Sequence, residues 1–271
     1  MTTALSPEHP TARAFLVRAN NPSPMTLEGT NTWVLVEPGG DQAIVVDPGP
    51  DDARHRDAVM AMVAAAGAKQ VALIVLTHGH VDHSEGAPAL SQVAAAPIRA
   101  VAPMHCSQGQ QQLSDGERLR IGGLHLDVIA TPGHTADSAC FLVDADAGLV
   151  TGDTILGRGS TVVARPDGVL ADYLASLRRL RALVDERQLL AVLPGHGPVV
   201  DDPAAKIDAY LQHREERLQQ VRAAALTSDT VDDVLQSVYG DVVPELQFAA
   251  RWSLLAQLDY LRDEGVSVPA E

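Results

Sequence analysis

The feature that most constrains this chain is an apolar stretch that leads directly into a cluster of metal-binding side chains. Residues 71–76 are all apolar, which is typical of a buried strand. The next seven positions, residues 77–83, contain three histidines and an aspartate. Neutral imidazole and carboxylate oxygen are both good ligands for zinc. This order predicts a buried strand that ends in a loop of metal ligands.

The spacing inside this cluster indicates more than one metal ion. His78 and His80 are two residues apart, so an extended backbone points both side chains to the same side. Asp82 and His83 are adjacent, so they point apart and do not easily bind the same face of one ion. Four donors in this arrangement favour two neighbouring ions.

Further candidate ligands follow other predicted strands. Strands are predicted at residues 32–36, 43–46, 124–129, 139–143, 148–151 and 189–193, and helices at about 52–66, 170–184 and 207–221. Turns after three of these strands carry His134, Asp153 and His196. With the first cluster they make five histidines and two aspartates, enough for two ions that share one carboxylate. A coordination position left open for water is what distinguishes a catalytic zinc site from a structural one.

The composition argues against several classes of partner. The formal net charge is −15 and the pI is near 4.9, so the surface repels phosphate backbones and binding to duplex DNA is not expected. No apolar stretch approaches the length of a membrane span, and residues 1–20 lack the pattern of a secretory signal. Cys106 and Cys140 belong to no CxxC motif, so a disulfide framework is not expected. We therefore expect a cytoplasmic protein without a membrane partner.

The last part of the chain has a different pattern from the rest. A helical stripe runs from residue 231 to Gly240, and a second helix is expected from near Pro244 to Gly265, with almost no strand signal. The length of 271 residues suits one large domain with a small appendage. We therefore predict a catalytic domain at residues 1–225 and a helical module at residues 226–271.

The combined motifs resemble the metallo-beta-lactamase-fold hydrolases, and most of all their glyoxalase II-like branch. The resemblance covers about residues 16–220 and includes Asp47 at the end of an early predicted strand. It implies an α/β fold, an αββα sandwich with the metals at one edge of its two sheets. It also implies two zinc ions, with manganese or iron as alternatives. The motifs assign His78, His80 and His134 to metal 1, Asp82, His83 and His196 to metal 2, Asp153 to the bridge, and Asp47 to a support behind the ligands.

Three further stretches are similar to the subgroup of beta-lactamase-like protein 2, namely residues 21–32, residues 152–157 and the helix that contains His213 and Arg214. Members of that subgroup carry a small winged-helix-like C-terminal module, which residues 226–271 match in length and helix pattern. Some members act as single-strand endoribonucleases, and this is the activity that the resemblance implies. The tail ends soon after Val268, which leaves little room for a wing.

The expected reaction is hydrolysis by a hydroxide that bridges the two metals. Two divalent ions lower the pKa of a shared water and polarise the bond under attack, at a carbonyl carbon or a phosphorus atom. Asp82 would orient the hydroxide and accept its proton. The candidate substrate-binding residues are Asn31, Arg158, Arg165 and His213.

Each of these four residues also has a simpler interpretation. Asn31 stands at the start of a strand, where a side-chain cap is usual, and His213 stands on a helix whose polar face, residues 213–217, is expected to be solvated. Arg158 and Arg165 follow the bridging aspartate in a glycine-rich loop. There they could bind an anionic substrate through the bidentate guanidinium or remain in solvent.

Several functions remain open from the sequence. The subgroup resemblance favours single-stranded RNA, whereas the charge of −15 favours a small-molecule ester, thioester or lactone, a β-lactam included. A mono-iron dioxygenase on the same scaffold would need only two histidines and a carboxylate. A binding protein with an inert core is disfavoured by the complete ligand set. The metal content separates the first two classes, and the oligomeric state does not follow from the sequence.

Overall fold

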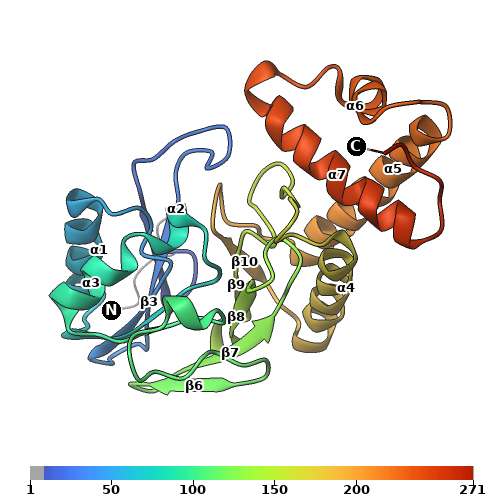
Figure 1. The fold of residues 1–271 in the computed structure, drawn as a ribbon. Helices are drawn as coiled ribbons and strands as arrows, with labels where there is room; N and C mark the ends of the chain where they lie inside the picture. The colour runs from blue at the N-terminus through green and yellow to red at the C-terminus, as the bar shows by residue number, and fades with distance from the viewer. Residues whose placement is uncertain (1–8, 271) are drawn as a thin grey trace.

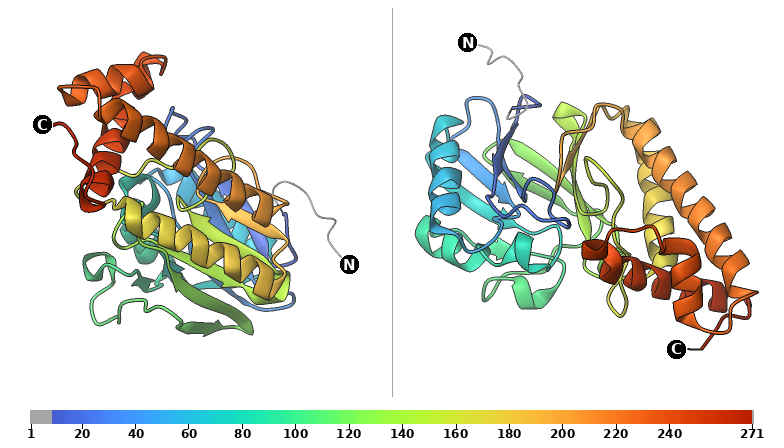
Figure 2. Two further views of the ribbon diagram at one scale, coloured as in Figure 1. Left: turned by 90° about the vertical axis from the view of Figure 1, so that its right-hand side faces the viewer. Right: turned by 90° about the horizontal axis from the view of Figure 1, so that it is seen from above.

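Two five-stranded sheets lie face to face between two outer layers of helices in the computed structural model, which describes residues 9–270 (Figure 1, Figure 2). The first sheet has the order β1-β2-β3-β4-β5, and the second has the order β10-β9-β8-β7-β6. In the first sheet, β1, β2 and β3 pair antiparallel, and β3, β4 and β5 pair in parallel. In the second sheet, β9 and β10 pair in parallel and the remaining neighbours pair antiparallel.

The strands of the first sheet are β1 (Ala14–Arg18), β2 (Asn31–Val36), β3 (Gln42–Val46), β4 (Gln70–Val75) and β5 (Ile98–Arg99). Those of the second sheet are β6 (Arg118–Ile121), β7 (Leu124–Ala130), β8 (Ala139–Val143), β9 (Gly148–Gly152) and β10 (Ala191–Pro194). The helices are α1 (Ala53–Ala65), α2 (Val81–Ser84), α3 (Ala87–Ala94), α4 (Leu170–Arg187), α5 (Pro203–Ala225), α6 (Val231–Tyr239) and α7 (Gln247–Asp263).

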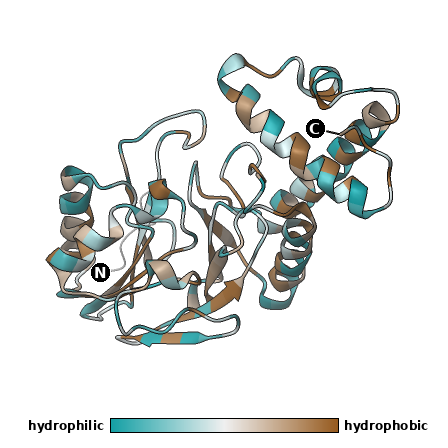
Figure 3. Cartoon of the chain, in the orientation of Figure 1, coloured by the Kyte–Doolittle hydropathy of each residue, from teal (hydrophilic) through white to brown (hydrophobic). Residues whose placement is uncertain are grey.

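Alternation along the strands explains how each sheet is covered on both faces. In β2, Trp33 and Leu35 point between the two sheets, whereas Val34 and Val36 point toward the outer helices. Strands that are buried on both faces form continuous apolar runs, and Figure 3 shows apolar residues along the strands of both sheets. Separate apolar clusters therefore fill the space under α1 and α3, the space between the sheets, and the space under α4–α7.

The fold expected from the resemblance is confirmed. Each predicted strand is present within two residues of its expected start and end, and the helix expected at 52–66 is α1, Ala53–Ala65. The structure adds β1, β5, β6 and α3, for which no prediction was made, and α2, which lies where a loop was expected. Among the described residues, no helix is long and apolar enough to cross a membrane.

The C-terminal helices pack beside α4 and α5 on the outer face of the second sheet (Figure 2). Their apolar side chains join one cluster that runs from Leu149 in β9 through Ile207 in α5 to Leu254 in α7. The predicted boundary at residue 226 follows the last residue of α5, Ala225, and the core continues across it. The tail up to residue 270 contains helices and no strand, so a wing is not shown.

Candidate metal centre

The ends of strands from both sheets meet at one edge and carry the predicted ligands. In the first sheet, β4 is followed by the loop with His78 and His80 and then by α2, which holds Asp82 and His83. In the second sheet, the loops after β7, β9 and β10 each carry one ligand, namely His134, Asp153 and His196. Loops on a rigid scaffold are the usual location of catalytic side chains.

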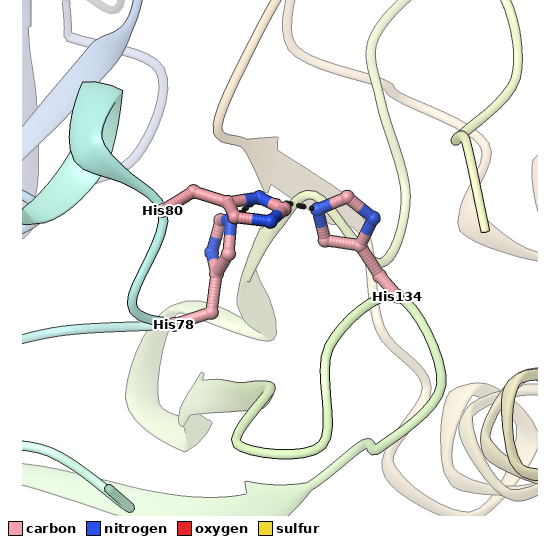
Figure 4. A group of neighbouring side chains, drawn as sticks. All are labelled: His78, His80 and His134. Carbon is pink, nitrogen blue, oxygen red and sulfur yellow. Dashed lines mark hydrogen bonds between the residues drawn. The ribbon is translucent and has the colours of Figure 1, made fainter. Parts of the chain in front are cut away.

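The first group of ligands consists of three histidines (Figure 4). The Nε2 atom of His78 lies 3.0 Å from Nδ1 of His80, and Nε2 of His134 lies 3.1 Å from the same atom. The rings converge from the loop after β4 and the loop after β7. His78 and His134 are buried and His80 is exposed, so the group is accessible from the side of His80.

The second group consists of Asp82, His83 and His196, so the expectation that the adjacent Asp82 and His83 point apart is wrong, because both lie on the helical turn α2 and not on extended backbone. The Nε2 atom of His196 lies 3.2 Å from Nε2 of His83 and 3.1 Å from Oδ2 of Asp82, and His83 Nε2 lies 3.5 Å from that oxygen. Asp153 lies between the groups. Its Oδ1 is 3.4 Å from Nε2 of both His83 and His196, and its Oδ2 is 3.8 Å from Nε2 of His134.

These spacings fit divalent metal ions. Metal–ligand distances of about 2.0–2.1 Å place the ligands of a tetrahedral zinc roughly 3.3 Å apart. The neighbouring donors within the two groups are 3.0–3.5 Å apart. Oδ1 of Asp153 is buried without a hydrogen-bond partner in the described structure, and such an oxygen is costly unless a cation or a donor meets it. The side chains present can therefore hold divalent ions in both groups.

Hydrogen bonds behind the rings fix their orientation. Asp47 Oδ2 lies 2.8 Å from Nδ1 of His83 and accepts from the Thr77 hydroxyl at 2.6 Å, and its Oδ1 accepts from the Thr77 backbone N–H at 2.7 Å. Nδ1 of His134 lies 2.7 Å from the carbonyl oxygen of Val162. Partners of this kind set the tautomer of a metal-binding histidine, and the structure places Asp47 in the supporting position that the resemblance implies.

Burial and neighbouring charges set the protonation of the ligands. Burial lowers the pKa of His78 and of His134, which favours the neutral imidazole that binds metals. Burial also lowers the pKa of His196, but the Asp153 carboxylate outweighs it and raises this pKa to about 9. Burial raises the pKa of Asp153, but His196 and His83 outweigh it and hold this pKa well below its usual range. The centre thus keeps a carboxylate charged in the interior, where a cation would be stabilised.

Two adjoining cavities open beside the ligands. The smaller, of about 150 Å³, lies over both groups and is bounded by His80, Asp82 and His196 and by Met25 and Trp252. The larger, of about 350 Å³, also reaches His134 and Asp153 and extends toward α5, α6 and α7. Its far wall is formed by His213, Arg214, Arg217, Tyr239, Val242, Leu246, Ala249, Ala250 and Ser253.

Asn31, one of the four predicted substrate-binding residues, lies away from both cavities. Asn31 is buried, and its Nδ2 donates to the carbonyl oxygens of Pro194 and Gly197 at 3.0 and 2.9 Å. Its side chain therefore holds the loop of His196 in place and faces neither cavity. His213, in contrast, lines the larger cavity.

The two predicted arginines are both engaged by carboxylates. Arg158 borders the larger cavity, but its side chain is 61% exposed and pairs with Glu28 at 2.7 Å. Arg165 pairs with Asp259 of α7 at 3.3 Å and does not line either cavity. The loop after β9 thus contacts α7 through Arg165 and borders the larger cavity through Arg158.

The predicted solvated face at residues 213–217 is wrong for Arg214, which is 5% exposed. Helices α6 and α7 fold against α5, and the Arg214 guanidinium lies 5.0 Å from the ring centroid of Tyr173. Arg217 and Tyr239 also line the larger cavity, and neither was predicted to do so. Helical periodicity shows which face of α5 is polar, but it does not show that two later helices enclose that face.

A sandwich that gathers histidines and aspartates at the shared edge of its sheets defines a metal-dependent hydrolase. The family model described as the metallo-beta-lactamase superfamily matches residues 25–196, and the chain belongs to that superfamily. Two solved structures share the fold. A metallo-beta-lactamase family protein from Thermus thermophilus has a TM-score of 0.77 at 22% identity, covering 93% of this chain and 94% of that one. A beta-lactamase domain protein from Burkholderia ambifaria has a TM-score of 0.78 at 21% identity, covering 97% and 90%.

Three curated relatives extend this assignment. The lactamase-like protein vrtG of Penicillium aethiopicum is 33% identical, over 94% of this chain and 81% of the relative. An atrochrysone carboxyl ACP thioesterase of Aspergillus fumigatus is 32% identical, over 78% of this chain and 64% of the relative. A beta-lactamase-like protein 2 homolog of Caenorhabditis elegans is 31% identical, over 92% and 84%. The subgroup expected from the sequence is thus among its relatives.

Proposed function

We propose that this protein is a two-metal hydrolase that cleaves a thioester whose acyl group occupies the larger cavity. The observation that carries the proposal is the position of that cavity. It begins at the ligands His134 and Asp153, and its walls include apolar or small side chains such as Leu156, Val242 and Ala250. A carbonyl placed at the ligands would therefore leave its acyl group against an apolar surface, where burial is favourable.

The proposed metal content is two zinc ions, one in each group of ligands. Imidazole and carboxylate suit zinc, although iron or manganese also bind such sets. When bound, two divalent ions supply hydroxide near neutral pH and polarise the carbonyl under attack. A single-iron dioxygenase needs two histidines and a carboxylate, whereas this edge presents two groups of three donors with Asp153 between them.

The chain's own residues have separate tasks in this proposal. Asp82 is partly exposed to the smaller cavity, so it orients the attacking water and accepts its proton. Asp47 and Thr77 hold the ring of His83, and Asn31 holds the loop of His196. Residues 226–271, which we propose as a separate module on the catalytic domain, supply one wall of the acyl site through α6 and α7.

A thioester is favoured over RNA by the relatives and by charge. Two relatives carry thioesterase names, the second from Aspergillus chevalieri, at 32% and 33% identity. The net charge of −15 opposes the approach of a polyphosphate strand. The apolar side chains on part of the wall of the larger cavity, such as Leu156, Val242 and Ala250, also suit an acyl group.

The test is metal analysis followed by a substrate panel. The panel contains hexanoyl-N-acetylcysteamine, S-lactoylglutathione, a lactone, a chromogenic β-lactam and a single-stranded RNA. We expect two zinc ions per chain and the highest kcat/KM with a thioester. Cleavage of the RNA alone would replace the proposal with an endoribonuclease, and one iron per chain with oxygen consumption would replace it with a dioxygenase.

A change of cavity volume tests the acyl site directly. Ala250 is 7% exposed and lines the larger cavity, so Ala250→Leu should fill part of it. We expect the variant to lose activity on long acyl thioesters more than on the acetyl thioester, by about 10-fold, as pocket contacts of this size allow. Ala223→Leu, on an exposed position of α5 outside the cavity, is the matched control. An equal effect on all chain lengths would place the acyl group elsewhere.

A further inference from the structure

The wall of the larger cavity contains a buried cation without a matching anion. Arg214 is 5% exposed, its Nη2 donates to the carbonyl oxygen of Thr161, and its guanidinium lies over the ring of Tyr173. Its Nε is buried and has no hydrogen-bond partner. Within residues 9–270, no carboxylate forms an ion pair with Arg214.

Arg217 lies on the same side of α5, one helical turn further on, and lines the same cavity. Its Nη1 donates to the carbonyl oxygen of Val238 at 3.0 Å, and its guanidinium lies 4.7 Å from the ring centroid of Tyr239. It too has no carboxylate partner in the described part of the chain. Both guanidinium groups are therefore held by carbonyl oxygens and aromatic rings, which leave the positive charge uncompensated.

His213 completes this wall. It lines the cavity beside the two arginines, and its Nδ1 is buried without a hydrogen-bond partner. Glu215 and Glu216, the carboxylates nearest in sequence, are exposed and bond to Gln219 and Gln212. The wall of the larger cavity thus combines ring and guanidinium nitrogens that have no hydrogen-bond partner with two arginines that have no carboxylate partner among the described residues.

Arginines elsewhere in the molecule show that this arrangement is unusual for the chain. Arg13 binds Glu37 and Asp146 at 2.7 and 2.6 Å, and Arg99 binds Glu117 at 2.7 Å. The chain has 35 acidic residues against 20 basic ones, so carboxylates are plentiful. A buried charge is costly unless it is paired, and arginine binds carboxylate through two parallel hydrogen bonds. An anion from outside the chain would supply the partner that Arg214 and Arg217 lack among the described residues.

We infer that Arg214, Arg217 and His213 form a subsite for a carboxylate carried by the acyl group of the substrate. This inference rests on the proposed function, because the metal ligands at the other end of the cavity would hold the thioester. The substrate class is then a thioester of an acid-bearing acyl group. Its apolar part lies along Val242 and Ala250, and its carboxylate meets the arginines.

The test compares two thioesters that differ only in a terminal carboxylate, adipoyl-N-acetylcysteamine and hexanoyl-N-acetylcysteamine. The leaving thiol is neutral in both, so the acyl group alone supplies the charge. We expect the metal-loaded enzyme to prefer the adipoyl substrate in kcat/KM by about 10-fold or more, the size of a hydrogen bond to a charged group. A ratio near one would overturn the subsite and leave the thioesterase proposal standing.

Variants then assign the preference to the cavity wall. Arg217→Gln should lower the adipoyl-to-hexanoyl ratio by about 10-fold, and Arg217→Lys, which keeps the charge, should retain part of it. Arg222→Gln removes an exposed arginine of α5 that pairs with Glu264 outside the cavity, so the ratio should not change. A purely structural role for Arg217 would lower both activities and leave the ratio intact, which would overturn the subsite. Arg214→Lys provides the second test if Arg217→Gln does not fold.

Two further experiments distinguish the carboxylate subsite from the remaining explanations. If hexanoyl-phosphopantetheine is preferred over hexanoyl-N-acetylcysteamine, and Arg217→Gln abolishes that preference, the wall binds the phosphate of the thiol and the acyl assignment is wrong. If no thioester is cleaved, the proposed function fails, and the carboxylate subsite is then tested by the binding of free acids. Adipate should then raise the midpoint of thermal unfolding more than hexanoate does in the wild type and not in Arg217→Gln; equal shifts would overturn it.

Discussion

The candidate metal centre and the cavity wall differ in whether their functional side chains have bonding partners that support or balance them. In the metal centre, Asp47 supports His83, and the carbonyl oxygen of Val162 supports His134. In the cavity wall, Arg214 and Arg217 have no anion to balance them within the described residues. Hydrogen bonds from behind therefore orient the rings of these candidate ligands, whereas the guanidinium groups of the wall have no carboxylate beside them in the described part of the chain. Under the two proposals, the strand ends would determine the chemistry, and the wall formed by α5, α6 and α7 would determine the substrate.

The largest effect should come from removing a ligand that both regions share. His134 and Asp153 belong to the metal centre and also border the larger cavity. We expect His134→Ala and Asp153→Ala to lose bound metal and to lower turnover by more than about 100-fold, since removing even a partner behind a ligand costs about 10–100-fold. Metal analysis and thioester kinetics would measure both. His125→Ala, at an exposed position, is the control; a ligand variant with full metal and full activity would refute that ligand's assignment.

A smaller effect is expected from weakening the support behind the ligands. Asp47 has a φ of 51°, a left-handed conformation that asparagine tolerates well, so Asp47→Asn keeps the backbone but replaces one of two accepting carboxylate oxygens with a neutral amide NH2 that donates. We expect metal affinity to fall by about 10–100-fold, because His83 loses a charged acceptor. Competition with a chelator would measure it. Asp51→Asn, on an exposed ion pair with Arg56, should leave the affinity unchanged.

The free energy of unfolding should depend on pH through the buried thiol of Cys140. Burial raises the pKa of the Cys140 thiol from 9.0 to about 11. Between these values the unfolded chain has lost the thiol proton and the folded chain keeps it, so stability falls as the pH rises. We expect a loss of about 1.4 kcal/mol per pH unit from this group. Denaturant unfolding of the wild type and of Cys140→Ala would measure it; parallel curves above pH 9 would contradict the prediction.

The smallest effect is expected at Arg158, and it sharpens the contrast with Arg217. Arg158 is mostly exposed and already paired with Glu28. Exposed ion pairs contribute up to about 1 kcal/mol, so Arg158→Gln should raise KM for the adipoyl thioester by less than about 5-fold. Steady-state kinetics beside Arg217→Gln would test this order. A larger effect at Arg158 than at Arg217 would indicate that the carboxylate of the substrate binds at Arg158.

The candidate metal ligands were predictable because the local order of residue types carries the information. A strand buried on both faces ends at a sheet edge, and the polar residue types after β4, β7, β9 and β10 indicate what that edge does. The resemblance supplied the pairing of ligands, and the structure brings these side chains together in three overlapping groups, one of which joins His78, His83 and Asp153. The supporting role of Asp47 followed from the same motif set.

The cavity wall could not be predicted in the same way, because it depends on contacts between distant segments. Arg214 would be solvated in an isolated α5, whereas in the folded chain it is buried and contacts Tyr173 of α4 and the carbonyl oxygen of Thr161 in the loop after β9. The sequence around Asn31 suggests a cap or a substrate contact, whereas its partners lie on β10 and the turn that follows, far along the chain. Short strands such as β5, Ile98–Arg99, carry too few residues for a periodic signal.

The contact between Asn31 and the loop of His196 has a consequence for how the site is made. His83 and His196 are 113 residues apart in sequence, and both belong to the second group of ligands. At synthesis rates of about 5–20 residues per second, a growing chain displays Asp82 and His83 for several seconds before the last donor is made. During that interval α2 holds an incomplete ligand set. The contact between Asn31 of β2 and the loop of His196 can form only after β10 has been made, so the second group of candidate ligands is completed late in synthesis.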